Sequence, residues 1–225
     1  MIPIACRILA LSAAALLAPT AGANVVHHFD SGAQGWRVTD IAAPTGVGAV
    51  APWDGGGQRL VTRDVTSWTV FDAPDAMLHD LSAYAGGRFS FDLQDTLKDA
   101  NADSVATFGI LGGNGARLFW YGGSPSTTLL SRFEATLGVA DSRWRLGGLP
   151  VDMNSGVAPT AQQWAAVLAD VAAIRINADW KTGGNDQSWL DNVALTVAVP
   201  EPQTYALLAI GLAAVGVAAL RRRAG

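Results

Sequence analysis

Aspartate and asparagine are the residues of this 225-residue chain whose spacing could bind a metal ion. Asp99, Asn101 and Asp103 have the spacing that opens a calcium loop, in which oxygen ligands lie on one side of a turn. The rest of that loop is absent, because Ser104 replaces the required glycine and Ile110 replaces the bidentate glutamate. A polar hairpin loop capped by its own side chains is the alternative interpretation.

Asp30 and Asp191 form a second candidate metal site. They lie near the two ends of the central segment, where they could meet and share a structural calcium ion. Asp191 has the strand parity of Trp189 and Val193, so we expect it to point inward, where an unpaired carboxylate is costly. A hydrogen-bonded structural role is the alternative. No cofactor other than such a structural calcium ion is expected.

Catalytic motifs are not found in the sequence. The histidines are His27, His28 and His79, and the chain has no Gly-x-Ser-x-Gly, His-Glu-x-x-His or phosphate-binding loop. Many aspartates could form a glycosidase pair, but spacing in sequence cannot select one. We therefore expect no enzymatic activity. A secreted glycoside hydrolase with an unrecognised carboxylate pair is the alternative.

Aromatic residues offer a third kind of site, for carbohydrate. The chain has eight tryptophans, all between residues 36 and 189. In a strand over residues 116–121, Trp120 and Tyr121 must point to opposite faces. We assign Trp120 to the core, and Tyr121 with Arg117 to the accessible face, where they could contact a polysaccharide. The alternative is that most of these rings belong to the core, as we expect for Trp36, Trp144, Trp164 and Trp189.

The composition narrows the class of protein. Hydrophobic residues make up 50% of the chain and charged residues 15%, which excludes a disordered protein. Residues 24–198 hold 11 basic and 18 acidic side chains, and this negative charge argues against a nucleic-acid partner. The single cysteine, Cys6, lies in a segment that we expect to be removed, so a disulfide framework is not expected.

The first 23 residues have the pattern of a secretory signal peptide. Arg7 precedes a short apolar run, and the small residues Ala21 and Ala23 precede Asn24. We expect the Sec translocon and signal peptidase as partners, with cleavage between Ala23 and Asn24. A permanent anchor is the alternative, but an apolar run of about ten residues is short for a bilayer.

The last 27 residues have three parts: Pro200-Glu201-Pro202, an uncharged segment over residues 203–220, and Arg221-Arg222-Arg223. Eighteen helical residues would rise about 27 Å, close to the hydrocarbon thickness, so we predict a transmembrane helix. The arginines would remain in the cytoplasm and the main domain would face outward. The alternative, an amphipathic helix, is disfavoured because the segment has no polar face.

These three parts resemble the PEP-CTERM sorting signal of exopolysaccharide-producing Gram-negative bacteria. The resemblance implies an exosortase, a membrane protease-transpeptidase, as partner, with cleavage near Pro200–Pro202. The expected location is a transient anchor in the inner membrane and then the cell surface or extracellular matrix.

The middle of the chain, residues 24–198, reads as one β domain with short alternating stretches between turn residues. Strands are predicted over Thr66–Phe71, Arg88–Leu93, Val105–Leu111, Ala116–Tyr121, Ser131–Leu137, Ala173–Ala178 and Ser188–Val197. Thr160 and Gln163 form a capping box before an apolar stripe, which predicts one helix near residues 160–171. The expected fold is a two-sheet sandwich or jelly roll.

A series of short segments resembles the laminin B (laminin IV type A) domain, in order over about residues 29–197. The segments include Phe29-Asp30-Ser31-Gly32, Ser82–Gly87, Phe89–Leu93, Trp144-Arg145 and Leu190–Val193. The resemblance implies a β-jelly roll of the galactose-binding-like type and an adhesive or structural role outside the cell. We therefore expect an exosortase-processed surface or matrix protein that acts in adhesion or exopolysaccharide and biofilm association.

Overall fold

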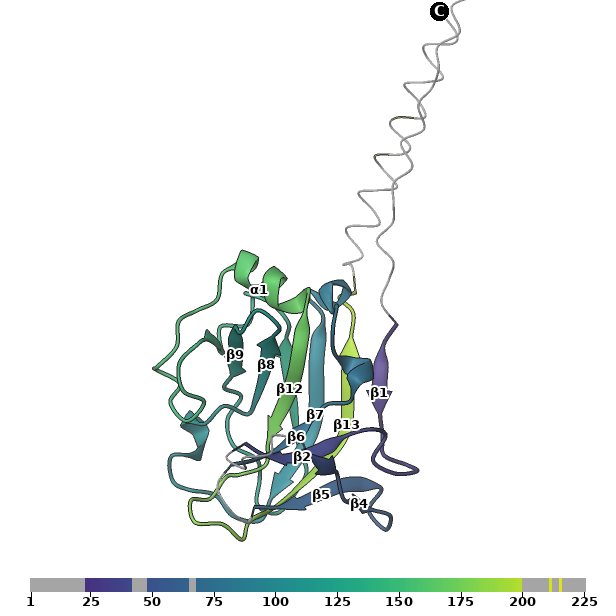
Figure 1. Ribbon diagram of the computed structural model, residues 1–225, viewed down its shortest axis with the longest axis vertical. Coiled ribbons are helices and arrows are strands. Elements are labelled where there is room, and N and C mark those ends of the chain that lie inside the picture. The colour runs from purple at the N-terminus through teal and green to yellow at the C-terminus, as the bar shows by residue number, and fades with distance from the viewer. Residues whose placement is uncertain (1–22, 42–47, 65–67, 200–210, 212–214, 216–225) are drawn as a thin grey trace, which may run out of the picture.

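The computed structural model describes residues 23–41, 48–64, 68–199, 211 and 215. Over these residues the chain forms two antiparallel β-sheets packed face to face, with one α-helix beside them (Figure 1). The predicted mainly-β sandwich is therefore confirmed.

Sheet A has the strand order β10-β7-β13-β5-β4, and β1 also pairs with β13. Its strands are β1 (Val25–His27), β4 (Trp53–Asp54), β5 (Arg59–Arg63), β7 (Arg88–Asp95), β10 (Ser131–Thr136) and β13 (Gln187–Thr196). The long strands β7 and β13 form its centre.

Sheet B has the order β11-β9-β8-β12-β6-β2-β3. Its strands are β2 (Arg37–Asp40), β3 (Ala49–Val50), β6 (Thr69–Asp72), β8 (Phe108–Gly112), β9 (Arg117–Trp120), β11 (Trp144–Leu146) and β12 (Val171–Asn177). Three short 3₁₀ helices connect strands: η1 (Asp75–Met77), η2 (Ser82–Tyr84) and η3 (Ala102–Ser104).

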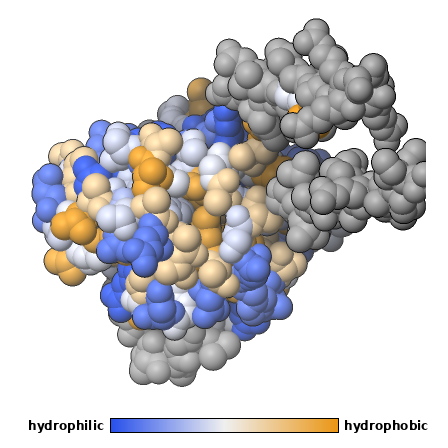
Figure 2. Space-filling model, turned by 90° about the horizontal axis from the view of Figure 1, so that it is seen from above, coloured by the Kyte–Doolittle hydropathy of each residue, from blue (hydrophilic) through white to orange (hydrophobic). Residues whose placement is uncertain are grey.

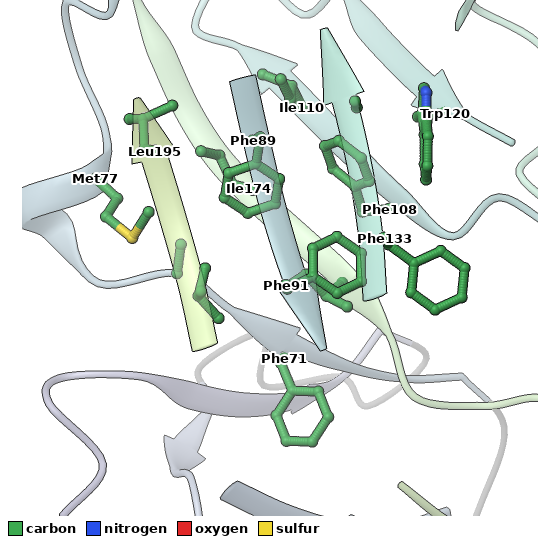
Figure 3. Close-up of a cluster of buried hydrophobic side chains, with 14 of the residues drawn as sticks. Phe71, Met77, Phe89, Phe91, Phe108, Ile110, Trp120, Phe133, Ile174 and Leu195 are labelled. Carbon is green, nitrogen blue, oxygen red and sulfur yellow. The ribbon is translucent and has the colours of Figure 1, made fainter. Parts of the chain in front are cut away.

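The core between the sheets combines aliphatic side chains with a group of aromatic rings (Figure 3). In β7 the alternation points Phe89 and Phe91 inward, as their spacing predicts. The Phe91 ring meets the Phe108 ring edge-on, with centroids 5.7 Å apart, and Phe108 meets Trp144 at 5.1 Å. Edge-to-face pairs of this kind add to the stability gained from burying apolar area.

The helix α1 (Ala161–Leu168) has the predicted capping box, because the Thr160 hydroxyl accepts from the Gln163 backbone and the Gln163 side chain accepts from the Thr160 backbone. Trp164, Val167 and Leu168 are buried, and the Trp164 ring packs edge-on against Trp144. The sequence pattern therefore predicts both the start and the buried face of this helix.

A β-bulge in β13 overturns one sequence expectation. The pairing register with β7 shifts between Asp191 and Ala194, and Asn192 has a left-handed φ of 50°. Leu190 before the bulge and Val193 after it both face the core. The predicted inward orientation of Asp191 is therefore wrong, because the extra residue changes the parity along the strand.

Different segments of the chain lie at the two ends of the sandwich. The start of β1 and the end of β13 lie near the end occupied by α1, whereas the loop between β12 and β13 lies at the opposite end (Figure 1). The loop between β12 and β13 therefore faces away from the end of the domain at which β1 begins and β13 ends.

The processing predictions fall mainly outside the described residues. These include the signal peptide up to residue 22, Pro200, Glu201 and Pro202, the segment 203–220 except for two residues, and Arg221, Arg222 and Arg223. Ala23 and Asn24 are described, and the Tyr84 hydroxyl donates to the Ala23 carbonyl. Among the residues that the structure describes, no helix has the length and apolar character needed to cross a bilayer.

Candidate functional site

Exposed apolar residues are distributed unevenly over the sandwich. Seen from the end that carries α1, hydrophobic residues are interspersed with hydrophilic ones, as on most protein surfaces (Figure 2). A concave apolar site lies instead on the outer face of sheet B, where a cavity of about 280 Å³ opens. We call this cavity the sheet-B groove.

The floor of the sheet-B groove is made by Val70, Gly109 and Phe119. Gly109 lies opposite Phe119 in the β8–β9 pair and opposite Arg175 in the β8–β12 pair, so these residues form a row across the sheet. A Cβ atom at Gly109 would lie 3.0 Å from the Phe119 ring. The glycine therefore lets the aromatic ring lie against the sheet.

The walls of the groove come from segments outside the central strands. Leu149 and Pro150 form one wall, and Ile41 and Trp68 form the other. The partly exposed Trp68 indole is held in place because its Nε1–H donates to Asn177 Oδ1 at 3.0 Å. An exposed but oriented aromatic ring therefore flanks an apolar floor.

Two arginines lie at the groove and differ in their partners. Arg175 Nε donates to Asp72 Oδ1 at 2.9 Å, so its charge is compensated on the neighbouring strand β6. Arg117 is exposed, and its guanidinium makes no ion pair or hydrogen bond with the residues that the structure describes. Arg117 is therefore the cation available to a ligand.

The sequence-predicted contact residue Tyr121 is placed differently. Trp120 lies in the core as predicted, with 1% of its surface exposed, and Tyr121 points to the outer face of sheet B. However, only 6% of Tyr121 is exposed, because the segment 149–153 covers it and its hydroxyl donates to the Leu149 carbonyl at 3.1 Å. Burial and the charge of Asp152 raise the pKa of Tyr121 to about 12. The predicted accessibility of Tyr121 is therefore wrong.

The predicted calcium loop at Asp99, Asn101 and Asp103 is not formed. The Asp99 carboxylate binds Lys181 Nζ and the Thr182 backbone, and these hydrogen bonds lower its pKa. The Asp103 carboxylate accepts from the Ser124 hydroxyl at 2.6 Å. The two carboxylates thus fix different loops, and the prediction failed because local spacing does not show distant partners.

The chain ends do bring Asp30 and Asp191 near one another, since the charge of Asp30 contributes to the raised pKa of Asp191 after the larger effects of burial and Asp92. The Asn192 amide donates to Asp92 at 2.8 Å and to Asp191 at 3.3 Å. The hydrogen-bonded role that the sequence left open therefore describes Asp191. Among the described residues, carboxylate oxygens converge instead in a different group, which consists of Asp64, Asp179 and Asp186.

Three groove residues were missed by sequence reasoning: Trp68, Arg175 and Asn177. Arg175 and Asn177 alternate with the buried Ile174 and Ile176 in a strand that the sequence does predict. Their outward position could have been inferred from this alternation. The position of Trp68 beside them depends on the pairing of β6 with β12, for which the sequence carries no signal.

Comparison with protein families gives two matches to this chain. Residues 70–209 match Laminin B (Domain IV), and residues 198–223 match the PEP-CTERM protein-sorting motif. The first match covers more than half of the sequence, so the protein belongs to the laminin B (Domain IV) family. The second is a signal for exosortase-dependent export, and the laminin-like domain indicates an adhesion-type role outside the cell.

Solved structures with a similar fold include the L4b domain of human laminin alpha-2, with a TM-score of 0.59, 14% identity, and coverage of 72% of this chain and 90% of that one. An exo-β-agarase gives a TM-score of 0.48 and 14% identity, covering 80% of this chain and 25% of that chain. A family 11 carbohydrate-binding module from Clostridium thermocellum gives a TM-score of 0.38 and 16% identity, covering 80% of this chain and 89% of that chain. Comparison with curated protein sequences gives no match.

Proposed function

We propose that the protein is a non-enzymatic adhesion module, a galactose-binding-like jelly roll that binds an extracellular polysaccharide of the biofilm through the sheet-B groove. The observation that supports this most is the groove itself, an apolar cavity on an open sheet face with a few polar groups at its rim. Ligand sites of proteins have this composition.

The groove residues suit the two chemical faces of a sugar. The C–H face of a pyranose packs on an aromatic ring, and Trp68 offers a partly exposed one. The buried Asn177 amide is engaged with Trp68 and Asp179, so it orients the Trp68 ring for such a contact. The free Arg117 guanidinium favours a polysaccharide with carboxylate groups, since arginine binds carboxylates through two parallel hydrogen bonds.

The positions of the carboxylates support binding rather than hydrolysis. A glycosidase needs two carboxyl groups that reach the same sugar, about 5–10 Å apart. Among the described residues, the groove is lined by no aspartate or glutamate. In the cluster of Asp64, Asp179 and Asp186, two of the three carboxylates are buried, so they cannot both contact a sugar.

Processing of the chain gives the first prediction. We expect the mature protein to begin near Asn24 and to end near Pro202, because the sorting motif directs it to exosortase after signal peptidase has acted. Intact-mass spectrometry of surface material from cells that express the protein measures both ends. A full-length chain that stays in the inner membrane would contradict the proposed route.

Loss of the groove residues gives the second prediction. We expect Trp68→Ala and Arg117→Ala each to weaken binding to the exopolysaccharide of the producing cells about tenfold, because each removes one direct contact of about 1–2 kcal/mol. Affinity electrophoresis measures binding, and thermal melts show that the variants are folded.

Matched controls for this prediction exist on sheet A. Trp53 and Arg63 are also exposed, and Trp53→Ala and Arg63→Ala remove the same groups from sheet A, outside the lining of the groove. We expect both to bind within about twofold of the unchanged protein. If all four variants weakened polysaccharide binding equally, the binding site would lie elsewhere. Release of reducing sugar ends from the polysaccharide would support the glycoside hydrolase alternative.

A further inference from the structure

Three aspartates from two separate loops meet at the end of the sandwich opposite α1 (Figure 1). Asp64 follows β5, and Asp179 and Asp186 lie in the loop between β12 and β13. One carboxylate oxygen from each lies within 4.8 Å of the others. We call this group the acidic cluster.

The acidic cluster is largely out of contact with solvent. Asp186 has 0% of its surface exposed and Asp64 has 2%, while Asp179 is partly exposed. The Trp180 backbone N–H donates to Asp186 Oδ2 at 2.8 Å. Asp186 Oδ1, by contrast, is buried without a hydrogen-bond partner among the described residues. An orphaned oxygen on a buried carboxylate is costly unless something else binds it.

The lysine of the same loop does not neutralise the acidic cluster. Lys181, the cation of the same loop, forms an ion pair with Asp99 instead. Thr69 donates its hydroxyl to Asp64 Oδ1 at 2.9 Å, but a hydroxyl does not neutralise charge. Three carboxylates held this close repel one another unless a positive charge lies between them.

We propose that Asp64, Asp179 and Asp186 bind a calcium ion, which links the loop after β5 to the loop between β12 and β13. Oxygen ligands lie 2.3–2.6 Å from calcium, so ligands on opposite sides of the ion are about 5 Å apart, which matches the spread of the cluster. The ion gives the buried Asp186 Oδ1 a partner.

Room for the remaining ligands lies beside the cluster. A cavity of about 450 Å³ is bounded by residues that include Asp64, Asp179, Trp68 and Thr182. Calcium takes six to eight oxygen ligands, and water in this cavity completes the set that three carboxylates begin. Magnesium needs a stricter octahedral geometry and loses water reluctantly, so calcium fits this irregular set better.

The ion also has a structural link to the sheet-B groove. Trp68 lines both cavities, and Asn177, which holds the Trp68 indole, also donates to the Asp179 carbonyl at 2.9 Å. Calcium therefore fixes one wall of the groove. The calcium site itself rests on the cluster alone and does not depend on which ligand the groove takes.

Thermal melts of the purified protein in chelator and in calcium test the proposal. At calcium about 100-fold above its Kd, we expect the Tm to rise by about 5–10 °C. Asp186→Asn and Asp179→Asn keep the size of the side chain and remove its charge, and both should lose this shift. In chelator both variants should melt at or above the unchanged protein, because the repulsion is relieved.

Two controls make the test specific. Asp191→Asn removes a carboxylate from the other acidic group near the chain ends, and it should keep the full calcium shift. Terbium luminescence, sensitised by Trp68 and Trp180 beside the cluster, should appear in the unchanged protein and be lost in Asp179→Asn. This readout serves if Asp186→Asn does not fold, since Asp179 is partly exposed.

Three results would overturn the calcium site. The first is an unchanged Tm and absent terbium signal in the unchanged protein. The second is an equal shift from sodium chloride at matched ionic strength, which would show general screening of charge. The third is a shift that survives in Asp186→Asn and Asp179→Asn but is lost in Asp191→Asn, which would place the ion near the chain ends.

Discussion

Replacing Trp120 with alanine should destabilise the domain by about 3–5 kcal/mol, measured by chemical denaturation. The indole is almost fully buried and packs against Phe108 and Phe133, with ring centroids 5.4 and 6.4 Å away. Its Nε1–H also donates to Asp141 Oδ2 at 2.9 Å. Truncation would leave a cavity between the sheets that their paired strands cannot close.

The neighbouring Tyr121 provides the comparison for this prediction. It belongs to a small cluster with Ala106 and Phe119 on the outer face of sheet B, against which Met153 of the covering loop packs. Tyr121→Phe removes only the hydroxyl, which donates to the Leu149 and Asp152 carbonyls, and should cost about 1 kcal/mol. A greater loss of stability in Tyr121→Phe than in Trp120→Ala would show that the faces of β9 are reversed.

The strands that the sequence predicts are those with regular alternation and clear turns. β7, β8 and β9 were found in this way, since the Gly112-Gly113-Asn114-Gly115 turn marks the hairpin and period-two spacing marks the strands. The strands β3 and β4 have two residues each, too few for any period to appear. Short edge strands depend on the sheet they join, so local sequence does not specify them.

The candidate sites depend even more than the short strands on contacts that the local sequence does not specify. Parity along β9 placed Trp120 and Tyr121 on the correct faces, but the covering loop comes from a segment whose position the strand does not encode. Asp99 and Asp103 share a metal-like spacing and turn to different partners. Residues that do converge, such as Asp64 and Asp186, lie far apart in the sequence and meet only through the pairing of β5 with β13.

Asp95, the last residue of β7, should make the protein more stable in mild acid than at pH 8. Its side chain is 0% exposed, and the Leu97 backbone and the Ser188 hydroxyl donate to it. Burial raises the pKa of Asp95 to about 7, above its ordinary value of 3.8. Between these two pH values the folded state holds a proton that the unfolded state has lost, so stability falls as pH rises through this window. The total change from this group is about 2–4 kcal/mol.

Urea denaturation across pH 4–8 in the presence of a chelator measures this slope without any contribution from bound calcium. Asp95→Asn removes the ionisation and should flatten the profile, while a slope from Asp179 remains because its pKa is also raised to about 7. Below pH 4 the sign reverses: hydrogen bonding holds the pKa of Asp99 below its ordinary value, so its contribution is lost as pH falls. We therefore expect maximal stability near pH 4–5 in chelator. A profile that rises steadily from pH 5 to pH 8, unchanged in Asp95→Asn, would show that Asp95 is already ionised in the folded protein at pH 5.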